Sequence, residues 1–346
     1  MRILVDVMSG DNAPDEILKG ALDAGKEFSV EIVLVGKKEI IEDSAKRQSL
    51  DISSVEIVPA EDVVTMEDDP IASVRVKKDA SMFVGLRALA EGKGDAFVSC
   101  GNTGALFTGA SLLVRKIKGV RRAALASILP MKKPVLVLDA GANVTTEPVY
   151  LEQFAVMGSA YMGAMYPIEN PRVGLLNNGT EDCKGTPLQI ATNLRLRECP
   201  VIQYVGGVEP SSVPFDVCDV VVTDGFTGNI YIKTIEGTGG LLLSRMKQML
   251  TSGPSGNMAA LLLKKHLKQF KTDFDASEHG GAPLLGIRKP VFKAHGASNA
   301  RAFRSTIRQA VQFTYADLTQ RMENKLAELA EFRKTHPTQE AENRDE

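Results

Sequence analysis

The sequence has few cysteines and histidines, and it contains no tryptophan at all. Its four cysteines form no C-x-x-C pair and only four histidines are available, so a zinc site is not expected. No run of about 18 consecutive apolar residues occurs, which argues against a membrane-spanning helix. A net charge of −2 provides no global attraction for nucleic acid. The remaining composition, 44% hydrophobic and 24% charged over 346 residues, is that of an ordinary globular protein.

Common cofactor and nucleophile motifs are also missing. No Gly-Lys pair has the P-loop context, and no G-x-G-x-x-G follows the first predicted strand, which disfavours the usual nucleotide-binding classes. Neither a G-x-S-x-G elbow nor an H-E-x-x-H motif occurs. The first residues, M-R-I-L-V-D-V, reach an acid at position 6 and do not read as a signal peptide. A cytoplasmic location with reduced thiols is therefore the default expectation.

Short apolar runs alternate with helical patterns along most of the chain. The predicted strands are residues 3–7, 31–35, 55–58, 96–99, 135–139, 173–177, 201–205 and 219–223. The clearest helical patterns between them are residues 15–26, 81–91, 150–166 and 186–197. Continuous apolar strands separated by helices are typical of an α/β fold, in which a mostly parallel sheet is covered on both faces.

The length predicts two α/β lobes that together form one catalytic unit, residues 1–335. Lobe one is assigned to about residues 1–145 together with 290–335, and lobe two to about 146–289. Further helical patterns cover residues 237–250, 258–270 and 299–332, and the amphipathic region 237–271 falls in lobe two. The polar and acidic residues 336–346 are expected to form a frayed tail.

Five predicted strands end in glycine beside small polar residues. These ends read M-S-G-D-N-A-P (8–14), S-C-G-N-T-G (99–104), D-A-G-A-N-V (139–144), N-N-G-T-E-D-C-K-G (177–185) and T-D-G-F-T-G-N (223–229). Ligands of open parallel sheets bind outside the carboxyl ends of the strands, and glycine lets backbone N–H groups approach an anion. Any single end is readily explained as a turn, but five together favour one polar, anion-tolerant cleft between the lobes.

At these residues the sequence resembles the bacterial phosphate acyltransferase family. The matching stretches are 6–14, 99–105, 138–143, 174–185, 219–230, K-T-I-E-G (233–237), G-G-A-P-L-L-G (280–286) and K-A-H-G-A-S (293–298). They follow one another from residue 1 to about 330, so the resemblance covers nearly the whole chain. Departures from the family pattern are Ser9, Cys100 and Gly207, which affect the shape of loops.

The resemblance implies a two-lobed α/β/α fold similar to isocitrate and isopropylmalate dehydrogenases and to phosphotransacetylase, with a cleft between the lobes, as a homodimer. It implies that a long-chain acyl group passes from acyl-acyl-carrier-protein to inorganic phosphate, with no nucleotide or metal cofactor. The acyl phosphate would pass to a membrane-bound glycerol-3-phosphate acyltransferase. The alternatives are a phosphotransacetylase-like enzyme using short-chain acyl-coenzyme A, an NAD- and metal-dependent decarboxylating dehydrogenase, and a non-catalytic membrane scaffold.

Four residues are candidates for catalysis. Lys184 is expected to bind phosphate or to stabilise negative charge, and His295 to protonate the leaving thiolate, although a lone histidine often serves packing. Asn102 is expected to contribute to a phosphate or oxyanion site, and Asp224 to orient Lys184 or the phosphopantetheine arm. The candidates for binding phosphate or substrate are Asp6, Gly10, Asp11, Ser99, Gly101, Thr103, Gly104, Asp139, Asn143, Asp182, Gly185, Thr227, Asn229 and Ser298.

Cys100 and Cys183 invite a covalent acyl-enzyme, but neither has an identifiable neighbouring base, so direct attack by phosphate is preferred. The basic segment 115–122 is either a docking site for the acidic carrier protein or a solvated helix end.

Residues 253–271 predict an amphipathic helix with lysines on one side and apolar residues on the other. Such a helix suits an anionic membrane surface, and the alternative is that its leucines form the dimer interface. The predicted membrane contacts are Met258, Leu262, Leu263, Lys264, Lys265, Leu267 and Lys268.

Overall fold

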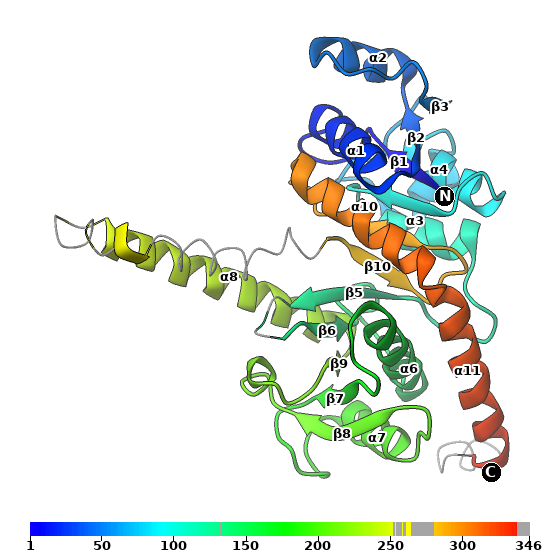
Figure 1. The fold of residues 1–346 in the computed structure, drawn as a ribbon. Coiled ribbons are helices and arrows are strands. Elements are labelled where there is room, and N and C mark those ends of the chain that lie inside the picture. Colours follow the sequence, from blue (N-terminus) through cyan, green and yellow to red (C-terminus); the bar gives the residue numbers. More distant parts are fainter. Residues whose placement is uncertain are drawn as a thin grey trace.

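The computed structural model describes residues 1–129, 131, 133–251, 253, 258, 261–263 and 280–337. Within this part of the chain, eleven strands form one sheet in the order β3-β2-β1-β4-β11-β10-β5-β6-β9-β7-β8 (Figure 1). The strands are β1 (Arg2–Asp6), β2 (Glu31–Gly36), β3 (Glu56–Pro59), β4 (Ala96–Ser99), β5 (Ala124–Leu129), β6 (Val135–Leu138), β7 (Arg172–Leu176), β8 (Gln203–Val208), β9 (Val220–Val222), β10 (Ala282–Leu285) and β11 (Val291–Lys293).

Helices cover both faces of this sheet. They are α1 (Asp15–Phe28), α2 (Lys38–Arg47), α3 (Pro70–Val76), α4 (Ser81–Ala90), α5 (Thr103–Gly109), the π-helix η1 (Ala110–Val114), α6 (Pro148–Met165), α7 (Pro187–Arg197), the 3₁₀ turn η2 (Val213–Phe215), α8 (Gly225–Leu250), α10 (Ala300–Tyr315) and α11 (Leu318–Thr335). Successive strand residues point to opposite faces, so Ile3 and Val5 enter one core while Leu4 enters the other. The predicted α/β class, with a mainly parallel sheet, is confirmed.

The direction of the strands reverses in the middle of the sheet. β10 is antiparallel to both of its neighbours, β11 and β5, and β5 is antiparallel to β6, whereas the other neighbouring strands run parallel. The carboxyl ends of β1, β4 and β11 therefore lie along one border of the sheet, the edge formed by the strand ends. Those of β6, β9 and β7 lie along the opposite border. The expectation that all five glycine-containing strand ends meet at one cleft is wrong, because the antiparallel pairs β11–β10, β10–β5 and β5–β6 turn β6, β9 and β7 against β1 and β4.

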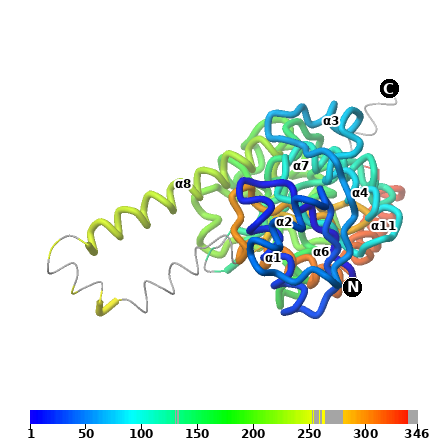
Figure 2. The backbone as a smooth tube through the Cα atoms, turned by 90° about the horizontal axis from the view of Figure 1, so that it is seen from above, coloured from blue at the N-terminus to red at the C-terminus, as the bar shows by residue number. Residues whose placement is uncertain are grey.

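The eight predicted strands are all present, with ends displaced by a few residues. The long helical pattern at 299–332 is divided into α10 and α11 by a turn in which Asp317 takes a left-handed backbone conformation with φ 49°. The helical pattern at 237–250 is the second half of α8, which begins at Gly225 and projects from the body of the molecule (Figures 1 and 2). Of the predicted tail, residues 338–346 lie outside the described part of the chain.

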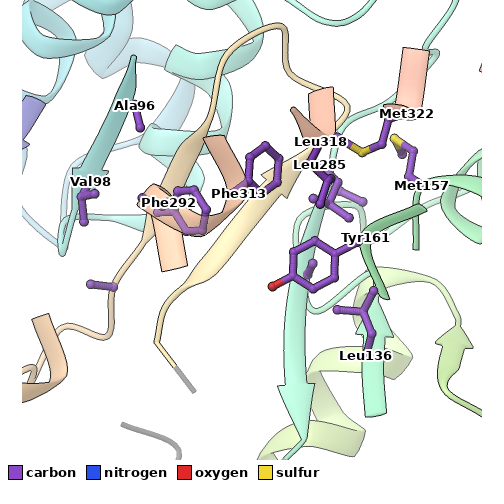
Figure 3. Packing of buried hydrophobic residues seen from close by; sticks show 14 of the residues in the cluster. Ala96, Val98, Leu136, Met157, Tyr161, Leu285, Phe292, Phe313, Leu318 and Met322 are labelled. Atoms are coloured by element: carbon purple, nitrogen blue, oxygen red, sulfur yellow. The ribbon is translucent and has the colours of Figure 1, made fainter. Parts of the chain in front are cut away.

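A buried core joins the two halves of the sheet. Phe292 of β11 meets Phe313 of α10 edge to face, with 5.5 Å between ring centroids, and Tyr161 of α6 lies beside them (Figure 3). Gln309 Nε2 donates a 2.7 Å hydrogen bond to the Tyr161 hydroxyl, which satisfies this buried polar group. α10 is thereby fixed to α6 as well as to the first strands of the sheet.

The C-terminal helix α11 packs on α6, so residues 318–335 lie against the part of the chain that the sequence assigned to lobe two. An ion network around Glu152 of α6, whose side chain is 1% exposed, joins the two helices in addition to their buried apolar residues. Glu152 binds Arg195 of α7 and Arg333 of α11, each at 2.6 Å. Arg333 also donates to the carbonyl oxygen of Arg195, so three helices share one buried carboxylate.

Replacing Glu152 with alanine should remove the buried carboxylate that Arg195 and Arg333 share. We expect E152A to lower the free energy of unfolding by about 3–5 kcal/mol, measured by chemical denaturation. The matched control is E331A on α11, whose carboxylate pairs with Lys334 where both side chains are 70% exposed, and this variant should unfold close to the wild type. Equal stability of E152A and E331A would show that the network contributes nothing.

Candidate functional site

A cavity of about 740 Å³ lies at the edge of the sheet where β4, β11 and β5 end and β10 begins. This volume is within the range of small-molecule binding sites. One wall carries polar groups from the segments after β4 and from β11 onward. The other comes from β5 and α8 and is mostly apolar, although Ser127 and Glu236 also belong to it. The residues lining it include Thr103, Ser127, Ile128, Leu129, Ile232, Ile235, Glu236, Gly239, Gly240, Leu243, Lys293, His295, Ser298, Asn299, Ala302 and Thr306.

The loop after β4 is held in place by a buried carboxylate. Asp6 is fully buried and accepts hydrogen bonds from Ser81 Oγ at 2.6 Å and Ser99 Oγ at 2.7 Å. Ser99 Oγ also accepts from the N–H of Gly101 at 3.0 Å. Burial raises the pKa of Asp6. Asp6, Ser99 and Gly101 therefore support the shape of the loop and do not line the cavity themselves.

Asn102 caps the start of α5 and is 9% exposed. Its Oδ1 accepts from the N–H of Ala105 at 3.1 Å, and its Nδ2 points at the carbonyl oxygens of Thr65 and Met66 at 3.4 and 3.3 Å. The amide is thus engaged with the backbone, whereas the next residue, Thr103, lines the cavity. Gly104 approaches Pro70 so closely that a Cβ would lie 2.8 Å from its ring.

The loop after β1 packs on the loop after β11. Asp11 donates its N–H to the carbonyl oxygen of Gly296 at 2.9 Å, and Gly10, with φ +114°, lies against Cys100. His295 is exposed at the cavity, and its Nδ1 accepts from the N–H of Ala297 at 3.2 Å, which leaves the proton on Nε2. Ser298 is buried and also lines the cavity. The predicted residues of β1, β4 and β11 thus gather at one place.

Lys293, the last residue of β11, was missed as an individual site residue. It lines the cavity and is 9% exposed. Its Nζ donates to the carbonyl oxygen of Cys100 at 3.1 Å and to that of Ala294. Burial lowers the pKa of this ammonium group. The only sequence signal was its position at the start of K-A-H-G-A-S, because a lysine at the end of a buried strand has no pattern of its own.

A second group of predicted residues forms a junction at the opposite edge. Asp139 accepts from the N–H of Asn143 at 2.6 Å and from its side-chain Nδ2 at 2.8 Å, and burial raises the pKa of Asp139. The carbonyl oxygen of Asn143 accepts from the N–H of Gly225 at 2.7 Å. Asp224 caps α8 through the N–H of Thr227 at 2.8 Å. This junction fixes the start of α8.

Asn229 lies near the start of α8, four residues after Gly225. A Cβ on Gly141 would lie 3.3 Å from the Asn229 side chain. None of Asp139, Asn143, Asp224, Thr227 and Asn229 lines the cavity described above. Their connection with it is indirect: they position α8, whose later turns form the apolar wall.

A third group, after β7, is exposed and separate. Asp182 pairs with Arg197 and accepts from Asn193 Nδ2 at 3.2 Å. Gly185, with φ +98°, packs against the Asn177 side chain. The ammonium of Lys184 has no carboxylate partner among the residues described, and it does not line the cavity. The sequence predicts that Asp224 lies close to Lys184. Within the described part of the chain, these two side chains form neither an ion pair nor a hydrogen bond.

Two predicted surfaces lie outside the cavity. The basic segment 115–122 comes before the first residue of β5, whereas Ser127 to Leu129 at the other end of that strand line the cavity. Of the predicted membrane contacts, Met258 and Leu262 are 61% and 75% exposed, and Leu263 is 45% exposed. Lys264, Lys265, Leu267 and Lys268 lie outside the described residues. In the described chain, no helix is long and apolar enough to cross a membrane.

The fold is shared with acyl-transferring enzymes. The structure is similar to a phosphotransacetylase from Streptococcus pyogenes, with a TM-score of 0.62 and 17% identity over 92% of this chain and 94% of that one. It is also similar to a branched-chain phosphotransacylase from Enterococcus faecalis, with a TM-score of 0.57 and 13% identity over 91% of this chain and 99% of that one. A 4-hydroxythreonine-4-phosphate dehydrogenase from Klebsiella pneumoniae reaches 0.51 with 12% identity, over 90% and 99% of the two chains. At these identities the likeness concerns the fold alone.

Sequence similarity then identifies the family. A family model described as fatty acid synthesis protein matches residues 1–321. A phosphate acyltransferase of Acetivibrio thermocellus is 46% identical over 315 residues, which is 90% of this chain and 93% of the relative. A phosphate acyltransferase of Oceanobacillus iheyensis is 44% identical over 92% of this chain and 95% of the relative. The chain belongs to this fatty acid synthesis protein family.

The four thiols should differ sharply in reactivity. Cys100 is fully buried, and burial raises its pKa to about 12, so at pH 8 only on the order of one molecule in ten thousand carries the thiolate. Burial also raises the pKa of Cys199 to about 11 and of Cys218 to about 12, whereas Cys183 is exposed. We expect iodoacetamide at pH 8 to modify Cys183 alone in the folded protein, as read by peptide mass spectrometry, and all four in urea. Alkylation of Cys100 as fast as Cys183 would contradict this and reopen a covalent intermediate.

Proposed function

We propose that this chain transfers an acyl group from a long-chain acyl-acyl-carrier-protein to inorganic phosphate, giving acyl phosphate and the free carrier thiol. The observation that carries the proposal is the close similarity to phosphate acyltransferases over nearly the whole chain. The cavity supports it, because a polar wall beside an apolar one suits a phosphate and a thioester that carries a hydrocarbon chain. The product would serve phospholipid synthesis.

In the proposed reaction, a phosphate oxygen attacks the thioester carbonyl carbon directly. The carbon–oxygen bond forms, the carbonyl oxygen becomes an oxyanion, and collapse of this intermediate breaks the carbon–sulfur bond. Phosphate is already substantially dianionic near neutral pH, so a strong general base is not required. The remaining tasks are to hold an anion beside the carbonyl, to stabilise the oxyanion and to protonate the departing sulfur.

The residues of the cavity divide these tasks. The buried ammonium of Lys293 places positive charge in the wall that carries Thr103 and Ser298, which favours an anion there. Nε2 of His295 holds the proton that the leaving thiolate needs. Asn102 acts as a positioning residue by accepting from the backbone N–H of Ala105. Asp6 and Ser99 do so through the hydrogen bond between their side chains.

Lys184 is proposed as a second phosphate-binding residue, on an exposed loop apart from the cavity wall that carries Lys293. The support is its unpaired ammonium among the described residues and the family resemblance of the 174–185 stretch. Asp224 is proposed to act on α8 through its cap.

We further propose that the two-lobed unit works as a homodimer in the cytoplasm and contacts the membrane peripherally, near the acyltransferase that consumes its product. The support is an exposed apolar surface on α8 and the segment after it, where Leu241 and Leu242 are each 59% exposed and Met249 is 65% exposed. Two partners would cover this exposed apolar surface: a membrane or a second copy of the chain.

The proposed activity is tested with purified protein, a long-chain acyl carrier thioester and phosphate, trapping acyl phosphate as hydroxamate. Absence of hydroxamate with every chain length would overturn the proposal.

We expect H295Q to lower kcat at least about a hundredfold, since general acid catalysis contributes on that order. The matched control is H336Q, which changes an exposed histidine at the end of α11 and should leave kcat unchanged. Equal activity of both variants would remove His295 from the mechanism.

The membrane proposal is tested at Leu262 and Leu263. The double variant L262E/L263E should no longer sediment with anionic liposomes, because two carboxylates replace exposed apolar side chains, while turnover of a water-soluble acyl substrate continues. Molar mass in solution, measured by light scattering, separates the two partners. Loss of the dimer with unchanged liposome binding would assign the segment to the interface between subunits.

A further inference from the structure

The apolar wall of the cavity contains two glycines in the middle of a helix. Ile232, Ile235, Gly239 and Leu243 of α8 follow one another at helical spacing on the face that lines the cavity, and Gly240 lies beside them. Glycine within a helix is less favourable than alanine, because the unfolded chain has more freedom to lose. Two adjacent glycines on this face therefore need a reason.

Packing within the described structure does not supply that reason. A Cβ added to Gly239 or Gly240 would meet no heavy atom of the described residues within 4 Å, so a side chain has space there relative to this part of the chain. By contrast, Gly225 and Gly228 at the start of α8 lie against the backbone near Asp139 and Asn143, where a Cβ would collide. Gly239 and Gly240 both line the cavity, so a side chain added at either position would extend into or beside it.

We propose that Gly239 and Gly240 set the length of acyl chain that the cavity accepts, by leaving open the space that the far end of a long chain occupies. This inference rests on the proposed acyl transfer. The wall on either side is mostly apolar, with Ile235 and Leu243 on α8 and Ile128 and Leu129 on β5, while Glu236 and Ser127 are its polar members. Covering each methylene of an acyl chain with the apolar part of this wall is favourable. A side chain at position 239 fills the same space and obstructs a long chain more than a short one.

The experiment compares G239L with G237L. Gly237 lies on the same helix, and a Cβ there also meets no atom of the described residues within 4 Å, but this glycine does not line the cavity. Both variants add the same side chain and raise helix propensity, so only the position relative to the cavity differs. The measured quantity is the ratio of kcat/KM for hexadecanoyl and octanoyl acyl carrier thioesters, with acyl phosphate trapped as hydroxamate.

We expect G239L to lower this ratio at least about tenfold, because even one misplaced methylene in an apolar site changes specificity by that order. G237L should keep the wild-type ratio. G239A, which adds only a methyl group, should shift the ratio in the same direction by less, and it keeps the test valid if the leucine variant folds poorly.

Two results would overturn the proposal. One is a wild-type ratio in both G239L and G239A. The other is dissociation of the oligomer in G239L with an unchanged ratio, since the glycines would then serve close approach of two helices. If the wild type gives no hydroxamate with either thioester, the proposed acyl transfer itself has failed, which is distinguishable from failure of the length determinant alone.

Discussion

The antiparallel strand β10 is the constraint on which the site depends. Because it pairs with β11 on one side and β5 on the other, its first residue lies beside the last residue of β11. The segments after β4 and β11 therefore share an edge with the end of β5 and the beginning of β10. If β10 were parallel to its neighbours, its beginning would lie at the far side of the sheet, away from Lys293 and from the loop after β4.

The junction around Asp139 gives the polar groups at the opposite edge a role in the same site. It fixes the start of α8 by the contact of Gly225 with Asn143 and by the Asp224 cap. From there the helix rises about 1.5 Å per residue, so Ile232 to Leu243 span roughly 16 Å of wall. The hydrogen bonds around Asp6 thus shape the loops of the cavity, and those around Asp139 determine the position of α8, which forms its mostly apolar wall.

Much of this fold was predictable, and the missing part has a physical cause. The eight predicted strands are continuous apolar runs with clear turns after them, which is the strongest signal a buried parallel strand gives. β10 and β11 were missed because they are short, glycines precede β10, and β10 contains Pro283. Thr103, His295 and Ser298 were predicted and line the cavity, but Lys293 and the α8 wall were not, since their role arises from the pairing of β10.

The positions of β10 and β11 also determine when the sheet can be completed during synthesis of the chain. These two strands come after residue 280, yet they lie between strands formed by the first hundred residues and strands formed by residues 124–222. Until they are synthesised, β4 and β5 each present an open edge, and open edges readily pair with other copies. No single division of the sequence gives two pieces that each contain all the strands of their own half of the sheet, because β11 is parallel to β4 and forms part of the first half. The growing chain thus holds two half-sheets whose joining strands arrive late, and any nascent protein released early is exposed to aggregation.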